Sequence, residues 1–152
     1  MGHIYVFVER SPSVRVTKRL FYVGSSVNVH ERIKQHTNNV CKRDTAEIYK
    51  YINASVGVEQ LEMMILDNRV PFGKEKTYER CYFNLLIAQG FELHNANKPI
   101  PEDPDLIVDI DFVNKVSINL SQFIARVLSK TSPEILEQCM TSEEMDISKL
   151  KR

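Results

Sequence analysis

Arg32 and His36 stand four residues apart in a segment expected to be helical, so both side chains project from one face of that helix. A guanidinium group is a permanent, planar cation whose shape matches the oxygens of a phosphate group. An imidazole group titrates near neutral pH and can accept or relay a proton. The pair therefore suits the hydrolysis of a phosphate ester, in which a water is activated and charge on the phosphoryl oxygens is relieved.

Each candidate side chain also has a purely structural interpretation. Tyr5 and Tyr22 lie in apolar stretches, where aromatic residues commonly pack in strands. His36 flanks the apolar stripe of its helix, where it could be a buried, hydrogen-bonded histidine. Arg32 could be an ordinary exposed cation.

The candidate carboxylate and amide each have a rival nearby. Glu79 competes with Glu75, one turn earlier on a predicted helix. Glu75 falls at the start of that helix, where the helix dipole alone favours a carboxylate, so Glu79 is the preferred candidate for chemistry. Asn95 competes with Asn97, and either could serve only to brace a loop.

Charge is unevenly distributed along the chain, although the formal net charge of the 152 residues is +0. Residues 1–100 contain 14 Lys and Arg against 10 Asp and Glu, whereas residues 101–152 contain 6 against 10. Within residues 10–50 the basic residues outnumber the acidic ones by 9 to 3. A local excess of this size can attract the phosphates of nucleic acid, although surface Lys and Arg are common in all proteins.

The three cysteines, Cys41, Cys81 and Cys139, are odd in number and far apart, so neither a disulfide framework nor a zinc site is expected. The N-terminal apolar run Ile4–Val8 is too short for the core of a signal peptide. No stretch approaches the roughly 20 apolar residues that a membrane span needs. We therefore expect a cytoplasmic protein with no membrane partner.

The first part of the chain predicts two strands followed by a helix. His3–Val8 is rich in β-branched and aromatic residues, which is typical of a buried strand. Residues 14–24 alternate and then become apolar, which predicts a second strand that pairs with the first as a hairpin. Asn28 is a candidate N-cap with Glu31 three residues later, so a helix is expected over residues 29–37.

The rest of the chain alternates helical and extended patterns. The expected elements are a helix over 45–54, a strand over 60–66, a helix over 74–89 that ends before Gly90, a helix over 111–129, and a short helix that begins at Ser132-Pro133. The three-proline, acidic stretch 98–104 is the candidate linker, and the polar tail 141–152 is expected to fray. This order of elements predicts an α+β fold with a small sheet.

Two tripeptides resemble the motif pair that names the GIY-YIG endonuclease superfamily. They are His3-Ile4-Tyr5 on the first predicted strand and Tyr22-Val23-Gly24 at the end of the second. In this family a loop containing Ser or Thr follows the second motif, and then a helix carries an arginine and, four residues later, a histidine or tyrosine. Arg32 and His36 occupy those two positions.

The resemblance extends further down the chain. The family places a glutamate in its last helix and an asparagine after that helix, and Glu79 and Asn95 stand there. The matching region covers roughly residues 2–99. It implies a small three-stranded antiparallel sheet flanked by helices in residues 1–99, with a linker and a helical C-terminal extension in residues 100–152.

The chain departs from the family pattern at three places. His3 replaces the usual glycine of the first motif, and Val23 conservatively replaces isoleucine in the second. Some relatives carry a lysine in the loop after the second motif, where this chain has Ser25-Ser26. The nearest cations are then Arg32 and Lys34.

The resemblance implies a metal-dependent endonuclease that hydrolyses phosphodiester bonds, in DNA rather than RNA. It implies that one divalent ion, Mg²⁺ or Mn²⁺, is held by Glu79, because Mg²⁺ keeps most of its waters and takes the rest of its shell from phosphate oxygens. Arg32 would contact the scissile phosphate. The implied catalytic residues are Tyr5, Tyr22, Arg32, His36, Glu79 and Asn95.

The general base remains open between two residues. Tyr5 is the candidate from the family, with Tyr22 in support, but half-ionising a phenol at pH 7 needs a pKa shift of about 3 units. Arg32, the metal and a protonated His36 could together supply that shift. His36 has a better-matched ordinary pKa and could instead be the base or relay a proton from Tyr5.

Partners follow from the same resemblance and from the basic segment. The expected nucleic-acid contacts are Arg19, Ser25, Ser26, Lys34, Lys42 and Arg43. A homodimer could supply the second site that a double-strand break needs, and the acidic C-terminal extension could brace the catalytic part or form that dimer contact. The alternative function is a catalytically silent module of the same fold that binds nucleic acid or a protein.

Overall fold

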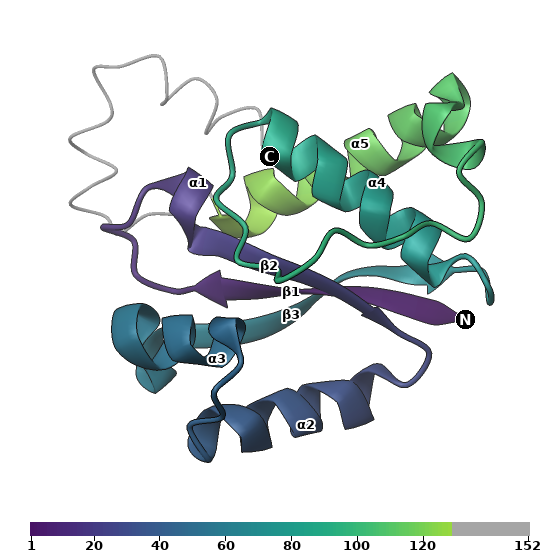
Figure 1. Ribbon diagram of the computed structural model, residues 1–152. Coiled ribbons are helices and arrows are strands. Elements are labelled where there is room, and N and C mark those ends of the chain that lie inside the picture. Colours follow the sequence, from purple (N-terminus) through teal and green to yellow (C-terminus); the bar gives the residue numbers. More distant parts are fainter. Residues whose placement is uncertain (129–152) are drawn as a thin grey trace, which may run out of the picture.

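The computed structural model describes residues 1–128 and is built around a three-stranded antiparallel sheet. Its strands are β1 (Gly2–Glu9), β2 (Leu20–Ser26) and β3 (Leu61–Val70), in the order β2-β1-β3. Helices cover both faces of the sheet, so the described part has three layers (Figure 1). The predicted α+β class and small antiparallel sheet are confirmed.

The central strand β1 is buried on both faces. Ile4, Val6 and Val8 belong to one apolar cluster, and Tyr5 and Phe7 belong to the other, on the opposite face. Because side chains alternate along a strand, a nearly continuous apolar run is the pattern of a strand that is covered on both sides. The same alternation places the Tyr5 hydroxyl on one defined face of the sheet.

The layer on the Tyr5 face consists of α2 (Val29–Cys41), α3 (Glu47–Tyr51), a π-helical turn (Ile52–Val56) and a 3₁₀ turn (Val58–Gln60). Asn28 begins α2 as predicted, since its side-chain oxygen accepts a hydrogen bond from the Glu31 amide at 3.4 Å. The helix continues past the predicted end at residue 37 because Val40 is buried against the sheet.

The opposite layer consists of α4 (Glu75–Ala88), a 3₁₀ turn (Leu106–Val108), α5 (Ile110–Phe123) and a π-helical turn (Ile124–Leu128). Gly90 has a φ of 90°, the left-handed conformation that commonly follows a helix end and that glycine adopts most readily. Its predicted place directly after the helix is therefore confirmed.

The predicted second strand is wrong in its first half. Val16–Arg19 forms the short helix α1, and β2 begins only at Leu20. Val16 packs against the core from α1, so tertiary contacts override the strand-like alternation of residues 14–19. The antiparallel pairing of β1 with β2 is as predicted.

Other predicted boundaries shift by a few residues. The third strand runs on to Val70, which is fully buried and pairs with Gly2. The helix expected over 111–129 is α5 followed by the π-helical turn, whereas the helix expected from Ser132 and the tail 141–152 lie outside the described residues. Within residues 1–128 no helix is long and apolar enough to cross a membrane.

The segment predicted as a linker, residues 98–104, is fastened to α4. The Pro99 carbonyl accepts a hydrogen bond from the Arg80 guanidinium at 2.9 Å. The Glu102 carboxylate accepts from the amides of Lys76 at 3.0 Å and Thr77 at 2.7 Å, which lie in the first turn of α4, where helix amides lack partners. α5 then shares one apolar cluster with α4 and the sheet, so the predicted boundary after residue 99 crosses a continuous core.

A part-buried polar network ties the sheet to both helices of this layer. The Tyr82 hydroxyl on α4 donates to Asp67 Oδ2 on β3 at 2.7 Å and accepts from Asn119 Nδ2 on α5 at 2.7 Å. Asn119 also donates to the Leu66 carbonyl at 3.1 Å. Burial, aided by Asp67, raises the pKa of Tyr82 above its ordinary value, so the group stays a neutral donor.

Replacing Tyr82 with Phe is expected to lower the free energy of unfolding by about 1–3 kcal/mol, because Asp67 and Asn119 each lose a partner. Urea unfolding measures the change. Tyr78→Phe is the matched control on the same helix: Tyr78 is buried, but its hydroxyl has no hydrogen-bond partner within residues 1–128. A similar loss in both variants would contradict the role given to the network.

Candidate active site

Tyr5, Tyr22 and His36 come from β1, β2 and α2 and form one aromatic cluster. The Tyr5 hydroxyl oxygen lies 2.8 Å from His36 Nε2. The Tyr22 ring centroid lies 6.3 Å from that of Tyr5 and 5.8 Å from that of His36. Tyr5 and His36 are each 1% exposed, so the hydrogen bond between them is shielded from bulk water.

Gly24 lets the Tyr5 ring lie against β2. It stands opposite Tyr5 in the β1–β2 pairing. A Cβ atom at this position would lie 2.5 Å from the Tyr5 hydroxyl oxygen, which is far inside van der Waals contact. The glycine of the second motif is therefore required by close approach of a side chain.

His36 is held from its other side by α3. Its Nδ1 atom lies 2.8 Å from the Tyr49 hydroxyl, and Asn39 Nδ2 donates to the same hydroxyl at 3.1 Å. Four side chains thus form a hydrogen-bonded chain, from Asn39 through Tyr49 and His36 to Tyr5. The sequence predicted a helix around Tyr49 but contained no signal that set it apart from Tyr51.

Burial determines the protonation of the cluster. It raises the pKa of Tyr5 above its ordinary value, helped by Tyr22 and opposed by the charge of Arg32. It also raises the pKa of Tyr22, helped by the Glu79 carboxylate. Burial, and then Arg32, lower the pKa of His36 to about 4, so His36 is neutral at pH 7. This pKa argues against a protonated His36 as the group that helps to ionise Tyr5.

Arg32 lies beside the two tyrosines on α2. Burial opposes its charged form, but Tyr5 and Tyr22 outweigh this and raise the pKa of Arg32 above its ordinary value. The side chain is partly exposed, and its Nη1 atom donates to Gln35 Oε1 at 2.9 Å. A permanent cation therefore stands next to the Tyr5–His36 pair, as the sequence predicted.

Glu79 reaches the site from the other layer, on α4. The residue is 4% exposed, and its Oε1 atom accepts hydrogen bonds from the Ser25 hydroxyl at 2.6 Å and the Lys76 ammonium at 3.1 Å. Its rival Glu75 instead binds its own turn, where it accepts from the Gly73 amide at 3.0 Å. Of the two carboxylates, Glu79 is the one that lines a pocket with Tyr22.

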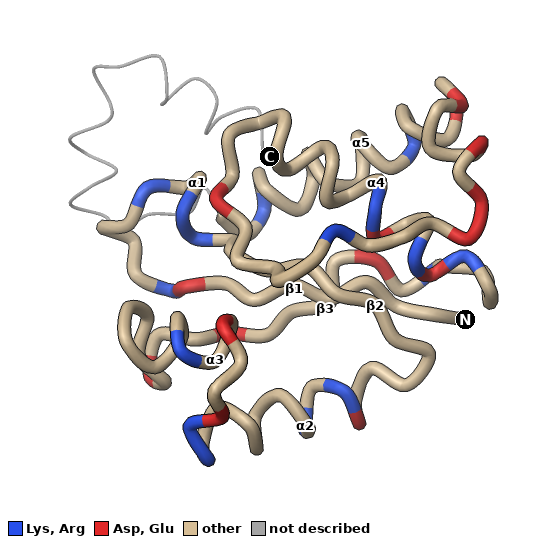
Figure 2. Tube along the Cα trace, in the orientation of Figure 1, with Lys and Arg blue, Asp and Glu red and all other residues tan. Residues whose placement is uncertain are grey.

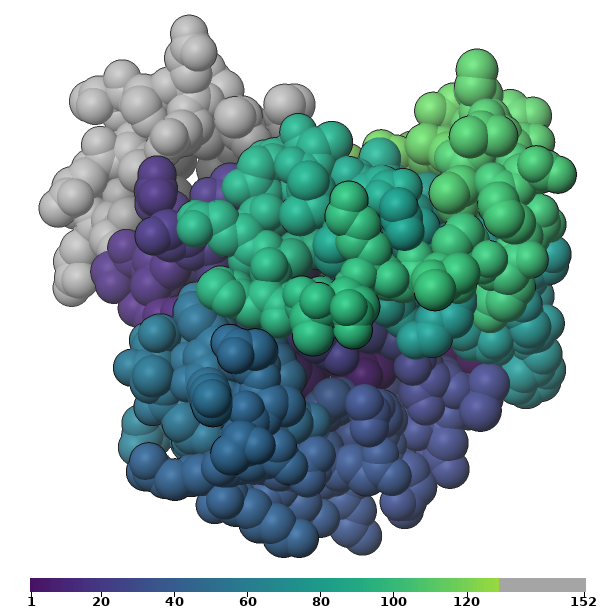
Figure 3. All heavy atoms as spheres, in the orientation of Figure 1, coloured from purple at the N-terminus to yellow at the C-terminus, as the bar shows by residue number. Residues whose placement is uncertain are grey.

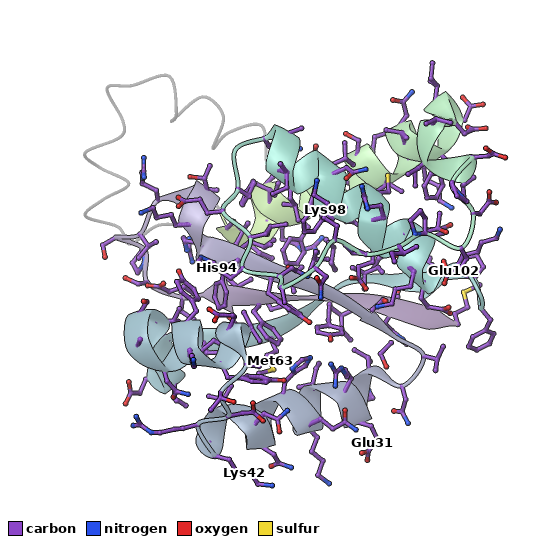
Figure 4. All side chains as sticks on the ribbon, in the orientation of Figure 1. Glu31, Lys42, Met63, His94, Lys98 and Glu102 are labelled. Carbon is purple, nitrogen blue, oxygen red and sulfur yellow. The ribbon has the colours of Figure 1, made fainter. Side chains whose placement is uncertain are left out.

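The pocket beside Glu79 has a volume of about 470 Å³ and is open to solvent. Figure 3 shows a hollow between the segment that follows α4 and the helices on the opposite side of the sheet. Lys76 and Lys98 also line the pocket, and Figure 4 shows Lys98 on the segment that crosses in front of the sheet. Anions that enter would therefore meet two lysines near a single buried carboxylate.

Asn95 forms part of the pocket wall. Its side chain donates to the Val23 carbonyl at 2.7 Å and accepts from the Val23 amide at 3.2 Å. Both polar atoms of the amide are thus engaged on β2, in the manner of an added strand residue. The geometry gives Asn95 a bracing role next to Glu79 and Tyr22.

The donor set around Glu79 fits a divalent ion that is held by one carboxylate. The two neighbouring donors converge on Oε1, and Oε2 accepts no hydrogen bond from residues 1–128. Mg²⁺ prefers such oxygen ligands and keeps several waters of its own. Across the described chain, no cluster of three or more His, Cys, Asp and Glu side chains could hold a metal by itself.

Arg19 does not belong among the nucleic-acid contacts. It is 6% exposed, and its guanidinium donates to the carbonyls of Glu9 at 3.1 Å, Arg10 at 3.1 Å and Leu128 at 2.6 Å. Arg19 thus links the end of β1 to Leu128, the last described residue. The prediction that Arg19 contacts nucleic acid is wrong, because sequence alone did not reveal its burial.

The other predicted contacts fall into two groups. Lys34, Lys42 and Arg43 are exposed along α2 and just beyond it, among the basic positions at the lower edge of Figure 2. Ser25 instead binds Glu79, and Ser26 accepts a hydrogen bond from the Asn28 amide at 3.0 Å. The three cations are free to meet a polyanion, whereas the two serines shape the loop and the carboxylate.

The sequence motifs did not indicate Lys76 and Lys98, which line the pocket. Lys76 stands one helical turn before Glu79, and this i, i+3 spacing on a predicted helix was a usable signal for an ion pair. Lys98 lay in the segment taken for a linker, so nothing marked it as part of a site.

Comparisons of the chain with protein-family models, with curated proteins and with solved structures found no match. The likeness to GIY-YIG endonucleases therefore stays a prediction that rests on the residues and their geometry.

The burial of His36 predicts a loss of stability in mild acid. Its pKa is about 4 in the folded protein against 6.5 in an unfolded chain, so only the unfolded state takes up a proton between these values. The contribution of neutral, buried His36 to the free energy of unfolding is complete above pH 6.5 and declines as the pH falls. At pH 5 the free energy of unfolding is lower by about 2 kcal/mol. Urea unfolding at several pH values measures this change. Between pH 7 and pH 5 the free energy of unfolding should fall less in His36→Gln than in the wild type, and an equal fall in the two proteins would contradict the prediction.

Proposed function

We propose that the chain is a divalent-metal-dependent endonuclease that hydrolyses phosphodiester bonds, in DNA rather than RNA. The observation that carries the proposal is the meeting of three chemical groups from separate parts of the chain. A buried tyrosine–histidine pair, Tyr5 and His36, lies beside the Arg32 cation, and Tyr22 joins that cluster to the pocket of Glu79. A proton acceptor, a permanent cation and a carboxylate are the groups that hydrolysis of a phosphodiester uses.

Each group has a defined task in the proposed reaction. Arg32 binds the scissile phosphate and balances its charge. Glu79 would hold the divalent ion, which when bound would neutralise charge on the phosphoryl and leaving oxygens. Tyr5 takes a proton from the attacking water, Tyr22 orients that water, and His36 supports Tyr5 through the hydrogen bond between Nε2 and the Tyr5 hydroxyl. One such site cuts one strand, so a double-strand break needs a second site or a second visit.

One observation favours the alternative, a silent module that binds nucleic acid or protein. Glu79 already carries the ammonium of Lys76 at 3.1 Å, so its charge is balanced without any metal. In an active enzyme the Lys76 ammonium would have to leave Glu79 when the divalent ion binds, and it could then pair with the substrate phosphate. In a silent module it would simply remain, and the pocket would bind an anion through Lys76 and Lys98.

Nicking of supercoiled plasmid in Mg²⁺ tests the proposal. Glu79→Gln keeps the shape of the side chain but removes its charge, and is expected to lower the nicking rate by about 100-fold or more. Glu75→Gln is the matched control, since that carboxylate binds the Gly73 amide of its own turn, and should retain the wild-type rate. Comparable losses in the two variants would remove Glu79 from the reaction.

Parallel assays with Mn²⁺, RNA and single-stranded DNA define the substrate. DNA cleavage that exceeds RNA cleavage is the expected result. No cleavage of any of these in either metal, together with salt-dependent DNA binding, would instead establish the silent module.

A further inference from the structure

Both ring nitrogens of His36 are engaged in buried hydrogen bonds, so the position of its proton is a structural question with a chemical consequence. Nε2 faces the Tyr5 hydroxyl and Nδ1 faces the Tyr49 hydroxyl, each at 2.8 Å. A neutral imidazole carries one N–H, so it donates to one tyrosine and accepts from the other. If Nε2 carries the proton, His36 donates to Tyr5; if Nδ1 carries it, His36 accepts from Tyr5.

Asn39 decides between these two arrangements. Its Nδ2 group can only donate, and it donates to the Tyr49 hydroxyl at 3.1 Å. The Tyr49 hydroxyl then directs its own proton to the remaining partner, His36 Nδ1. Nδ1 is therefore the acceptor, which leaves the proton on Nε2, facing Tyr5. The hydrogen bonds run in one direction, from Asn39 to Tyr49, to His36, to Tyr5.

We propose that Tyr49 is a positioning residue for the proposed hydrolysis, which, together with Asn39, fixes His36 as the Nε2–H tautomer so that His36 donates to the Tyr5 oxygen. This inference rests on the proposed function for its kinetic consequence, but the tautomer itself does not. Tyr49 is 6% exposed and belongs to the same apolar cluster as Tyr5, so its hydroxyl is held in place by packing.

The tautomer assigns the base that the sequence left open. With Nε2 protonated, His36 has no free lone pair toward Tyr5 and cannot take a proton from it. The Nε2–H bond instead stabilises the deprotonated Tyr5 oxygen. That oxygen accepts a proton from water: one O–H bond of the water breaks and the Tyr5 O–H bond forms. The hydroxide forms a P–O bond as the bond from phosphorus to the leaving oxygen breaks. The leaving oxygen takes up a proton from solvent, and Tyr5 returns its proton to solvent. His36 stays neutral throughout.

The opposite tautomer would work against this step. A His36 Nε2 lone pair would accept the Tyr5 proton in a hydrogen bond and so hold Tyr5 in its protonated form. Arg32 is the charged group that affects His36, and it disfavours an imidazolium there. The relay from Asn39 thus helps to ionise Tyr5 without placing a second positive charge in the cluster.

Nitrogen-15 NMR of the His36 ring tests the tautomer on the whole chain without any assay of activity. Long-range ¹H–¹⁵N spectra show which ring nitrogen carries the proton. The expected result at pH 7 is a protonated Nε2 and an unprotonated Nδ1. A protonated Nδ1 in the wild-type protein would overturn the proposal.

Asn39→Asp reverses the first hydrogen bond with almost no change in shape. The carboxylate can only accept, so the Tyr49 proton turns toward residue 39, and His36 must then donate through Nδ1. The expected result is a switch of the His36 tautomer to Nδ1–H. An unchanged Nε2–H tautomer in a folded Asn39→Asp protein would show that the relay does not set the proton position.

The kinetics of Tyr49→Phe test whether the tautomer affects the proposed reaction. Loss of the hydroxyl frees His36 to adopt either tautomer, which raises the pKa of Tyr5. For each unit of that rise, kcat below the Tyr5 pKa falls about tenfold. KM should stay unchanged because Tyr49 does not line the Glu79 pocket. The rising limb of the kcat–pH profile should move to higher pH, which a merely structural defect would not produce.

Tyr51→Phe is the matched control, since Tyr51 lies on the same helix, stacks on His94 and has no hydrogen bond to His36. It should retain the wild-type tautomer and pH profile. If no variant or wild-type protein cleaves nucleic acid, the proposed function fails while the NMR result still stands. If the wild type cleaves and Tyr49→Phe has the same kcat and pH profile, the positioning role fails and the proposed function stands.

Discussion

Burial of β1 on both faces is the constraint on which the rest of the described structure depends. A strand covered from two sides must place every side chain in an apolar layer, and one of them here is Tyr5, which carries a hydroxyl. A buried hydroxyl without a partner is costly, so the layer beneath must supply one. His36 on α2 supplies that partner through Nε2. Its other ring nitrogen, Nδ1, is buried as well and needs a partner of its own, which is the Tyr49 hydroxyl. Asn39 in turn donates a hydrogen bond to that hydroxyl. The polar chain is thus a consequence of packing a tyrosine in the core, and its chemical use depends on the direction of its hydrogen bonds.

The free edge of β2 presents a second constraint with a related solution. An exposed strand edge is open to unwanted pairing and is usually covered. The segment after α4 covers it: the His94 amide donates to the Phe21 carbonyl at 2.7 Å, and the Asn95 side chain pairs with both backbone groups of Val23. The same segment forms one wall of the pocket, because Asn95 both pairs with β2 and lines the pocket beside Glu79.

How far the sequence could predict this structure depends on how local each relationship is. The spacing of Arg32 and His36 and the cap at Asn28 are fixed within one helix, and both were readable. Tyr49 reaches His36 through a turn whose path no short pattern encodes, so it could not be chosen over Tyr51. Arg19 illustrates the opposite error, because a cation that is satisfied by three carbonyls resembles a surface cation in sequence. The strand predicted over residues 14–24 is wrong only in its first half, where packing of Val16 against the core outweighs the local alternation.

The position of Glu79 is set by the fold and does not require a bound ion. The first turn of α4 is held by Glu102, which binds the amides of Lys76 and Thr77, and Glu79 lies on the next turn. A carboxylate that is only 4% exposed needs nearby positive or hydrogen-bonding groups, and Lys76 and Ser25 provide them. Both act on Oε1, which leaves Oε2 for another ligand. An ion that binds there gains a preformed ligand but must compete with the ammonium of Lys76, so its affinity should be modest until substrate oxygens complete its shell. Such an arrangement would couple metal binding to substrate binding, since the phosphate offers Lys76 a second anion to pair with.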